Sequence, residues 1–190
     1  MIITLNGSEG SGKTTVAKKI ASELDYVRYT TGEIFRAMAK KRGLTLVEYV
    51  QLGETDPEID KEVDDYVVKL SKEQDNFILD SRMAWHFIPQ STKIYLNVDE
   101  REGAKRVFAE LQKDNSRNEM KNTPKTVEEV LKKIQARQKT DDTRYLQYYN
   151  VNIRDKKNYD FVLDTTELFP EEVFEKVMAF INSKINAQPS

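Results

Sequence analysis

A glycine-rich run near the N-terminus constrains the fold of this chain more than any other feature. It reads GSEGSGKTT from Gly7 to Thr15 and directly follows the short apolar segment from Ile2 to Leu5. The run matches G-x-x-x-x-G-K-[ST], a pattern in which glycines let backbone N–H groups turn inward around a phosphate. A helix beginning near Lys13 would direct the positive end of its dipole at the same phosphate. We therefore predict a strand, a phosphate-binding loop and a helix in succession.

The residue types of this loop indicate that it binds ATP. Lys13 is expected to reach the β and γ phosphates and to act in catalysis, and the Thr14 hydroxyl is expected to ligate Mg²⁺. The alternative is a glycine-rich turn with an incidental lysine, which the strand before it and the helix after it disfavour. The predicted ATP-binding residues are Gly7, Ser8, Glu9, Gly10, Ser11, Gly12, Lys13, Thr14 and Thr15.

Strand signals recur along the chain between stretches with helical spacing, and we expect long polar helical stretches between the later ones, at residues 77–79, 94–98 and 161–163. This alternation is typical of right-handed crossovers around a parallel sheet, with ligands bound at the carboxyl ends of the strands. The predicted fold class is α/β, a three-layer P-loop NTPase fold with a central parallel five-stranded sheet and helices on both faces. After Ile2 to Leu5, we predict strands at residues 26–29, 77–79, 94–98 and 161–163, and helices at 13–24, 32–41, 45–52 and from Asp56-Pro57 onward.

A chain of 190 residues is long enough for one well-buried core, and a second full domain would be cramped. We expect a single kinase domain with two inserts. The core is assigned to residues 1–30, 76–112 and 158–190, an insert that binds the acceptor nucleotide to about 31–75, and a lid to about 113–145. Residues 113–126 are polar, include Pro124, and are expected to form a loop or part of that lid.

Composition excludes several classes of function. The chain carries 30 basic and 32 acidic residues, with a formal net charge of -2, and the charges are interspersed, so no nucleic-acid footprint is evident. It contains no cysteine, which excludes disulfides, thiolate metal sites and thiol nucleophiles. No apolar run approaches membrane-spanning length, and no secretory signal precedes the first strand. We expect a cytoplasmic monomer without nucleic-acid or membrane partners.

The positions of the arginines indicate how the ATP phosphates are used. No N-K-x-D guanine motif occurs, which disfavours a GTPase switch. A small-molecule kinase must neutralise charge on two partners, and the arginine fork binds phosphate bidentately. Arg36 lies one turn into a predicted helix, Arg82 follows a strand, and Arg137 and Arg144 share a late helix.

The late helix carries Arg137, Asp141 and Arg144 at i, i+4 and i+7, along one face. At this spacing Asp141 can hold both guanidiniums. A solvated ion-pair face, contributing a few tenths of a kcal/mol, is the alternative. The phosphate loop makes a functional cluster more plausible without removing that alternative.

Asp80 and His86 are two further residues whose side chains could take part in the chemistry. Asp80 ends the apolar run 77–79, where a P-loop fold needs a carboxylate to hold the water shell of Mg²⁺; the alternative is a carboxylate that caps a turn. The lone His86, beside Trp85 and Phe87, is expected to be a packed or half-exposed residue rather than a catalyst.

Nearly the whole chain resembles the archaeal-type branch of the cytidylate kinases, within the nucleoside monophosphate kinases. The phosphate loop marks only the superfamily, and the other segments together are specific. Besides GSEGSGKTT these are TTGEIFRAMAKKRG from Thr30, DPEID from Asp56, LDSR from Leu79, the R-x-x-x-D-x-x-R segment from Arg137, and the closing stretch from Arg144 to Val173. Asp80-Ser81-Arg82 stands where the family commonly has Glu-Gly-Arg.

The resemblance implies transfer of the ATP γ-phosphoryl group to CMP or dCMP, giving the diphosphate and ADP. It places Thr31 and Arg36 in the acceptor region and Arg82 on the acceptor phosphate. It also implies an arginine cluster near the transferred group, formed by Arg137, Asp141 and Arg144, with both arginines catalytic. Because the acceptor is itself a phosphate anion, no general base is needed.

Two alternatives remain open at the level of sequence. The first is another small-molecule P-loop kinase with AMP, UMP, dTMP or a shikimate-like acceptor, because base choice depends on a few hydrogen bonds. The second is a nucleotide-dependent switch that uses ATP without an acceptor, which the set of arginines disfavours.

Overall fold

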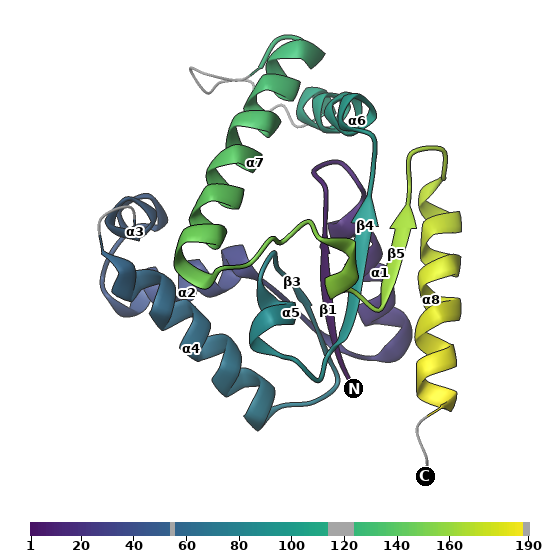
Figure 1. Ribbon diagram of the computed structural model, residues 1–190, viewed down its shortest axis with the longest axis horizontal. Coiled ribbons are helices and arrows are strands. Elements are labelled where there is room, and N and C mark those ends of the chain that lie inside the picture. The colour runs from purple at the N-terminus through teal and green to yellow at the C-terminus, as the bar shows by residue number, and fades with distance from the viewer. Residues whose placement is uncertain (54–55, 114–123, 188–190) are drawn as a thin grey trace.

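The structure is a computed structural model that describes residues 1–53, 56–113 and 124–187. At its centre lies a five-stranded sheet of order β2-β3-β1-β4-β5 in which every neighbouring pair is parallel (Figure 1). Because β1 is central, the loop that follows it opens at the middle of the carboxyl edge of the sheet. The strands are β1 (Ile2–Gly7), β2 (Val27–Thr30), β3 (Phe77–Asp80), β4 (Thr92–Asn97) and β5 (Phe161–Asp164).

Helices cover both faces of the sheet, as parallel strands require. They are α1 (Lys13–Leu24), α2 (Thr31–Lys41), α3 (Leu46–Gly53), α4 (Pro57–Glu73), α5 (Ala84–Phe87), α6 (Glu100–Lys113), α7 (Val127–Tyr149) and α8 (Pro170–Asn186), with a short 3₁₀ turn at Lys156–Asn158. None of the helices in the described part of the chain combines the length and the apolar character needed to cross a membrane.

The pleat of the strands sorts the core into two halves. Ile3 and Ile78 point to one face, where they pack with α1 and α8, whereas Ile2 and Phe77 point to the other, under α2 to α5. All four side chains are at most 8% exposed. The two halves together fix the sheet, and with it the position of the loop after β1.

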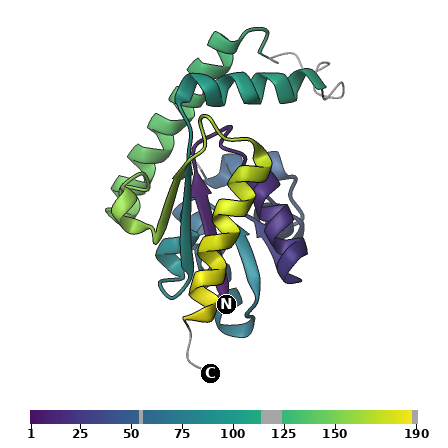
Figure 2. The same cartoon turned by 90° about the vertical axis from the view of Figure 1, so that its right-hand side faces the viewer.

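The α6 and α7 helices form a hairpin beyond the carboxyl edge of the sheet (Figure 2). They share a small apolar cluster of their own, in which Ala104, Val130 and Ile134 are buried. From there α7 runs along the molecule to α4, on the side of α2 and α3 (Figure 1). The long helix α7 thus connects the hairpin beyond the sheet with the helices of the predicted acceptor insert.

Local sequence signals set the helix starts. Thr30 and Glu33 form a reciprocal capping box at α2, and Asp56 caps α4 with Pro57 at its first turn. One face of α4 is apolar and buried, at Ile59, Val63, Val67 and Leu70, and Tyr66 is partly buried beside them. These signals involve residues close in sequence, which explains why they could be recognised without the fold.

The predicted strands and helices lie within two residues of the observed ones, but one connection differs. Between β3 and β4 we expected a long helix, and the structure has only the four-residue α5. The crossover passes over β1 alone, so a short connection is sufficient. Residues 114–123 of the predicted lid, including Arg117, lie outside the described residues, and the division into core, insert and lid stays a prediction.

Candidate active site

The phosphate loop is pressed against the start of α6. Gly10 has a φ of +77°, and a Cβ on Gly10 would lie 2.3 Å from the carbonyl oxygen of Gly103. A Cβ on Gly103 would in turn lie 2.5 Å from the carbonyl oxygen of Glu9. Both distances are too short for any side chain, so glycine is required on both sides of this contact. The helix after β4 therefore supports the phosphate loop from behind.

Lys13 is held inside the curve of the loop. Its Nζ donates hydrogen bonds to the carbonyl oxygens of Gly7 at 2.8 Å and Ser8 at 2.7 Å. Burial lowers the pKa of Lys13 to about 8, although Asp80 and Glu9 act in the opposite direction. A bound phosphate would raise that pKa again, so the ammonium is a cation that nucleotide binding stabilises.

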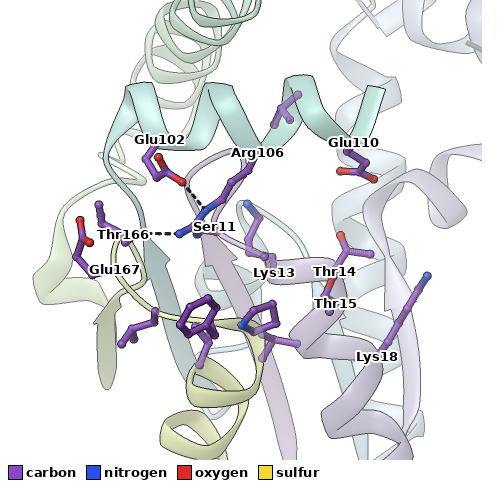
Figure 3. A pocket seen from close by; sticks show the side chains of 18 of the residues that line it. Ser11, Lys13, Thr14, Thr15, Lys18, Glu102, Arg106, Glu110, Thr166 and Glu167 are labelled. Carbon is purple, nitrogen blue, oxygen red and sulfur yellow. Dashed lines mark hydrogen bonds and ion pairs between the residues drawn. The ribbon is translucent and has the colours of Figure 1, made fainter. Parts of the chain in front are cut away.

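A cleft of about 1020 Å³ opens beside the loop, between α1, α6 and the segment that links β5 to α8. Figure 3 shows Lys13, Thr14 and Thr15 lining the cleft, with Arg106 reaching from α6 toward Thr166. The Arg106 guanidinium donates to the carbonyl oxygen of Thr166 at 2.8 Å and pairs with Glu102 at 3.2 Å. The cleft adjoins the phosphate loop, so it has room for the rest of a nucleotide whose phosphates lie in that loop.

Sequence reasoning did not predict Arg106 or the segment after β5 as part of the site. A general signal was available, because ligands of parallel α/β folds bind where strands end, and Thr166 lies just beyond the end of β5. What the sequence could not show is that α6 would fold back over that same edge.

Thr14 and Asp80 lie together where the Mg²⁺ site was predicted. The Thr14 hydroxyl donates to the Asp80 carboxylate at 3.2 Å. Within the described residues no group of three or more acidic, histidine or cysteine side chains could hold a metal by itself. One hydroxyl and one carboxylate suit a Mg²⁺ ion whose other ligands are phosphate oxygens and water, as is usual for this ion.

Arg82 is the centre of a charged cluster above the loop. Its Nη2 donates to Glu9 at 2.8 Å, and its Nε lies 3.1 Å from Asp141 Oδ2 in an ion pair without hydrogen-bond geometry. Burial alone would raise the pKa of Glu9, but the hydrogen bond and charge of Arg82 outweigh it and lower that pKa to about 2. Glu9 is therefore ionised at every pH near neutrality.

One detail predicted for the late helix is wrong. Asp141 does not hold both Arg137 and Arg144: Arg137 Nε is 4.0 Å from its carboxylate, and Arg144 instead pairs with Asp60 on α4 at 3.6 Å. Asp141 is engaged by Arg82 from the sheet, a contact that spacing along one helix cannot reveal. The expected common face does exist, because α7 is a continuous helix from Val127 to Tyr149 and carries Arg137, Asp141 and Arg144 at i, i+4 and i+7.

Thr31 and Arg36 both lie on α2. The Thr31 hydroxyl donates weakly to the carbonyl oxygen of Asp80, at 3.5 Å. Arg36 is exposed, and its Nη1 lies near Gly32 at the start of the same helix. The structure thus brings Thr31 next to the end of β3 and leaves the Arg36 side chain at the open side of α2.

The sequence did not predict a polar contact that joins α7 to α4. The Tyr149 hydroxyl donates to Asp64 at 2.5 Å, and the Tyr149 ring packs edge-on against Phe87 and His86. His86 is half-buried in this aromatic group, as expected, and burial lowers its pKa. The contact joins the C-terminal end of α7 to α4.

Comparison with known proteins identifies the family. The profile of the Cytidylate kinase-like family matches residues 2–167. The chain belongs to the cytidylate kinase-like family. A cytidylate kinase of Pyrococcus furiosus is 37% identical over 183 residues, which cover 96% of this chain and 88% of the relative. A cytidylate kinase of Sulfolobus acidocaldarius is 34% identical, with 97% and 96% covered. The resemblance inferred from sequence segments is confirmed.

Solved structures with the same fold include other kinases. A shikimate kinase from Bacteroides thetaiotaomicron has a TM-score of 0.61 at 15% identity, covering 96% of this chain and 98% of that one. A protein from Eubacterium ventriosum described as uncharacterized has a TM-score of 0.72 at 16% identity, covering 96% and 99%. At such identities the likeness shows the fold alone, and it confirms the predicted P-loop kinase architecture.

Proposed function

We propose that this cytidylate kinase-like chain transfers the γ-phosphoryl group of ATP to CMP, giving CDP and ADP. Family membership over residues 2–167 supports the reaction type and the acceptor. The observation that contributes most from the structure is the presence of two cationic centres, Lys13 in the phosphate loop and Arg82 just after β3, whose positive charges both act on the Glu9 carboxylate. Two anions can be brought together only where positive charge is supplied for both.

Each predicted site residue has a place in this proposal. The loop from Gly7 to Thr15 binds the ATP phosphates, and Lys13 neutralises charge on the transferred group. Arg82 and Arg36, with Thr31, bind the acceptor. Arg137 and Arg144 are the arginines that α7 brings to the transferred phosphoryl group, and Asp141 orients Arg82.

Mg²⁺ is part of the proposal. Thr14 would ligate the ion directly, and Asp80 would hold it through water. The ion would supply charge neutralisation between the phosphates, and the protein would orient the reactants. The 3.2 Å contact between the Thr14 hydroxyl and Asp80 supports this assignment, because it places both oxygens beside the phosphate loop.

No residue in the described site is needed as a general base. The acceptor oxygen already carries negative charge, so the barrier lies in alignment and in stabilising spread charge. The helix α7 belongs to the predicted lid and forms a hairpin with α6 beyond the carboxyl edge of the sheet (Figure 2), and closure of α7 over the bound nucleotides would exclude water that could otherwise hydrolyse ATP.

An acceptor panel tests the function. The protein is incubated with ATP, Mg²⁺ and each of CMP, dCMP, UMP, AMP, dTMP and shikimate, and both ADP and the phosphorylated product are followed. We expect the fastest turnover with CMP, and turnover of dCMP as the finer part of the proposal. If no nucleoside monophosphate is phosphorylated, the assignment as a nucleoside monophosphate kinase is wrong. If a nucleotide with another base is turned over faster than CMP, the assignment of cytosine is wrong.

The shikimate kinase neighbours do not favour shikimate as acceptor, because their likeness is at 15–19% identity and extends to the fold only. The cytoplasmic location and the monomeric state stay predictions. Size-exclusion chromatography with light scattering would measure the latter.

A further inference from the structure

A carboxylate in a phosphate loop requires an explanation, because it repels the anion that the loop binds. Glu9 is such a group: it is ionised, and only 17% of its side chain is exposed. The pattern G-x-x-x-x-G-K-[ST] does not demand it, since position 9 is one of the variable positions. We therefore looked to the contacts of the Glu9 carboxylate with other elements for a contribution that offsets its repulsion of phosphate.

The contacts of Glu9 reach two other elements. One carboxylate oxygen accepts from Arg82 at 2.8 Å, just after β3, and the other lies 3.3 Å from the side-chain amide of Gln138 on α7. These partners are distant in sequence, and only the fold brings them to the loop. Glu9 thus connects the ATP loop with the cation proposed to bind the acceptor phosphate and with the helix above both.

Arg82 is fixed at both its backbone and its side chain. Its backbone carbonyl is fixed by hydrogen bonds from Asn6 at 3.1 Å and from the Trp85 indole at 3.0 Å. Its side chain is held by Glu9 at Nη2 and by Asp141 at Nε. Nε and Nη2 lie on one edge of the guanidinium, and the ion pairs with Asp141 and Glu9 are made through these two atoms. The two carboxylates therefore orient the plane and leave the other edge for an anion.

We propose that Glu9 is a positioning residue, which holds the Arg82 guanidinium in the orientation that binds the acceptor phosphate. This inference rests on the proposed function, because it takes Arg82 as the acceptor-phosphate residue. A different role would be a placeholder, in which Glu9 occupies the place of the phosphate and must be displaced. The pairing of both carboxylates with the Nε–Nη2 edge of Arg82 favours positioning, and the two roles predict opposite effects on acceptor affinity.

The test compares Glu9→Gln, Arg82→Ala and the double variant with the full-length wild type. Glu9→Gln keeps the size of the side chain and removes its charge. The chain has a single tryptophan, Trp85, whose indole donates a hydrogen bond to the Arg82 backbone carbonyl. Isothermal titration measures CMP binding to each variant, and Trp85 fluorescence is a second readout. Steady-state kinetics give the KM for CMP and for ATP separately.

We expect Glu9→Gln to weaken CMP binding by about tenfold or more, as for a hydrogen bond to a charged group, while the KM for ATP changes by less than about twofold. In the Arg82→Ala background the same substitution should change CMP binding by less than about twofold, because its target is gone. Glu171→Gln is the matched control, since it removes a 2.6 Å ion pair with Lys19 on the surface.

Three results would overturn the proposal. Tighter CMP binding in Glu9→Gln would show a placeholder, a loss confined to ATP would show a role in the donor site alone, and additive losses in the double variant would show that Glu9 does not act through Arg82. Thermal melting of each variant separates these effects from loss of folding. Turnover of CMP by the wild type is measured in parallel, so failure of the proposed function is seen independently.

Discussion

At the scale of single residues, Arg82 is the group on which most of the proposed acceptor chemistry depends. It follows β3, next to Asp80 at the proposed metal site, and its guanidinium is oriented by carboxylates from the phosphate loop and from α7. Such a cation is pre-organised, so a phosphate that binds to it does not have to order a flexible side chain first.

Replacing Arg82 with alanine is expected to weaken CMP binding by about 10- to 100-fold, the size of a lost charged hydrogen bond, with ATP affinity nearly unchanged. Isothermal titration with each nucleotide measures both. Arg42→Ala is a suitable control, because Arg42 forms a 2.9 Å pair with Glu62 outside the site. Equal losses for CMP and ATP would contradict the assignment of Arg82 to the acceptor.

Asp64 makes a pH-dependent contribution to stability. Burial raises its pKa to about 6, assisted by Asp60 and Asp65 and opposed by the Tyr149 hydrogen bond and by Arg144. Because the folded pKa lies above the ordinary value of 3.8, the native state holds this proton more tightly than the unfolded state does. The free energy of unfolding therefore falls as pH rises from about 4 to 6, and above 6 the cost is fully present.

Asp64→Asn should remove that cost while retaining an acceptor for Tyr149. We expect it to stabilise the fold at pH 7 by on the order of 1 kcal/mol, a value discounted for the partial exposure of the group, with a smaller difference at pH 4. Urea unfolding at both pH values measures it. A variant that is less stable at pH 7 than the wild type would show that the charged hydrogen bond outweighs burial.

At the scale of elements, the contact between the phosphate loop and α6 decides the shape of the ATP site. The backbones of Gly10 and Gly103 are in direct contact, so a shift of α6 relative to the phosphate loop would change the conformation of the loop. The helix is thus part of the donor site, although no residue of α6 appears in the phosphate-loop motif.

Gly103→Ala is predicted to weaken ATP binding by at least about tenfold, because the new Cβ would displace the Glu9 carbonyl, a backbone atom that cannot give way cheaply. Equilibrium binding of ATP measures the loss. Gly32→Ala is the control, since its Cβ would meet only a movable guanidinium at 3.5 Å. An unchanged ATP affinity in Gly103→Ala would mean that the loop adapts.

At the scale of the whole molecule, the sheet has a large apolar core, whereas the hairpin of α6 and α7 has a small one. The central strand β1 is buried along its whole length, whereas the hairpin of α6 and α7 depends on its own small cluster around Ala104, Val130 and Ile134. Polar contacts, such as those of Gln138, Arg144 and Tyr149, join α7 to the rest. This distribution of contacts is what a lid requires.

Hydrogen exchange should reveal the difference. We expect amides of α7 to exchange faster than those of β1 and β4 in the free protein, because regions with few buried apolar contacts open at lower free energy. Exchange in α7 should slow when ATP and CMP are both bound. Mass spectrometry of peptic fragments measures exchange in the free and the nucleotide-bound protein. Equal protection of α7 and β1 in the free protein would contradict the expected mobility of α7.

The sequence by itself determined the features that depend on neighbours along the chain. The run from Gly7 to Thr15 specified a phosphate loop, alternation of strands and helices specified a parallel sheet, and caps such as Asp56-Pro57 set helix starts. Each is a short-range requirement of backbone geometry, so it is written in consecutive residues. The short α5 was missed because a crossover can be made with or without a full helix.

Only the tertiary structure decided which charges meet. Helical spacing placed Arg137, Asp141 and Arg144 on one face correctly, but it could not show that Asp141 pairs with Arg82 or that Arg144 turns to Asp60. The partners of Glu9 lie 73 and 129 positions further along the chain. The physical reason is that Coulomb and hydrogen-bond energies depend on distance in space, and distance in space is fixed only when the sheet and the helices pack.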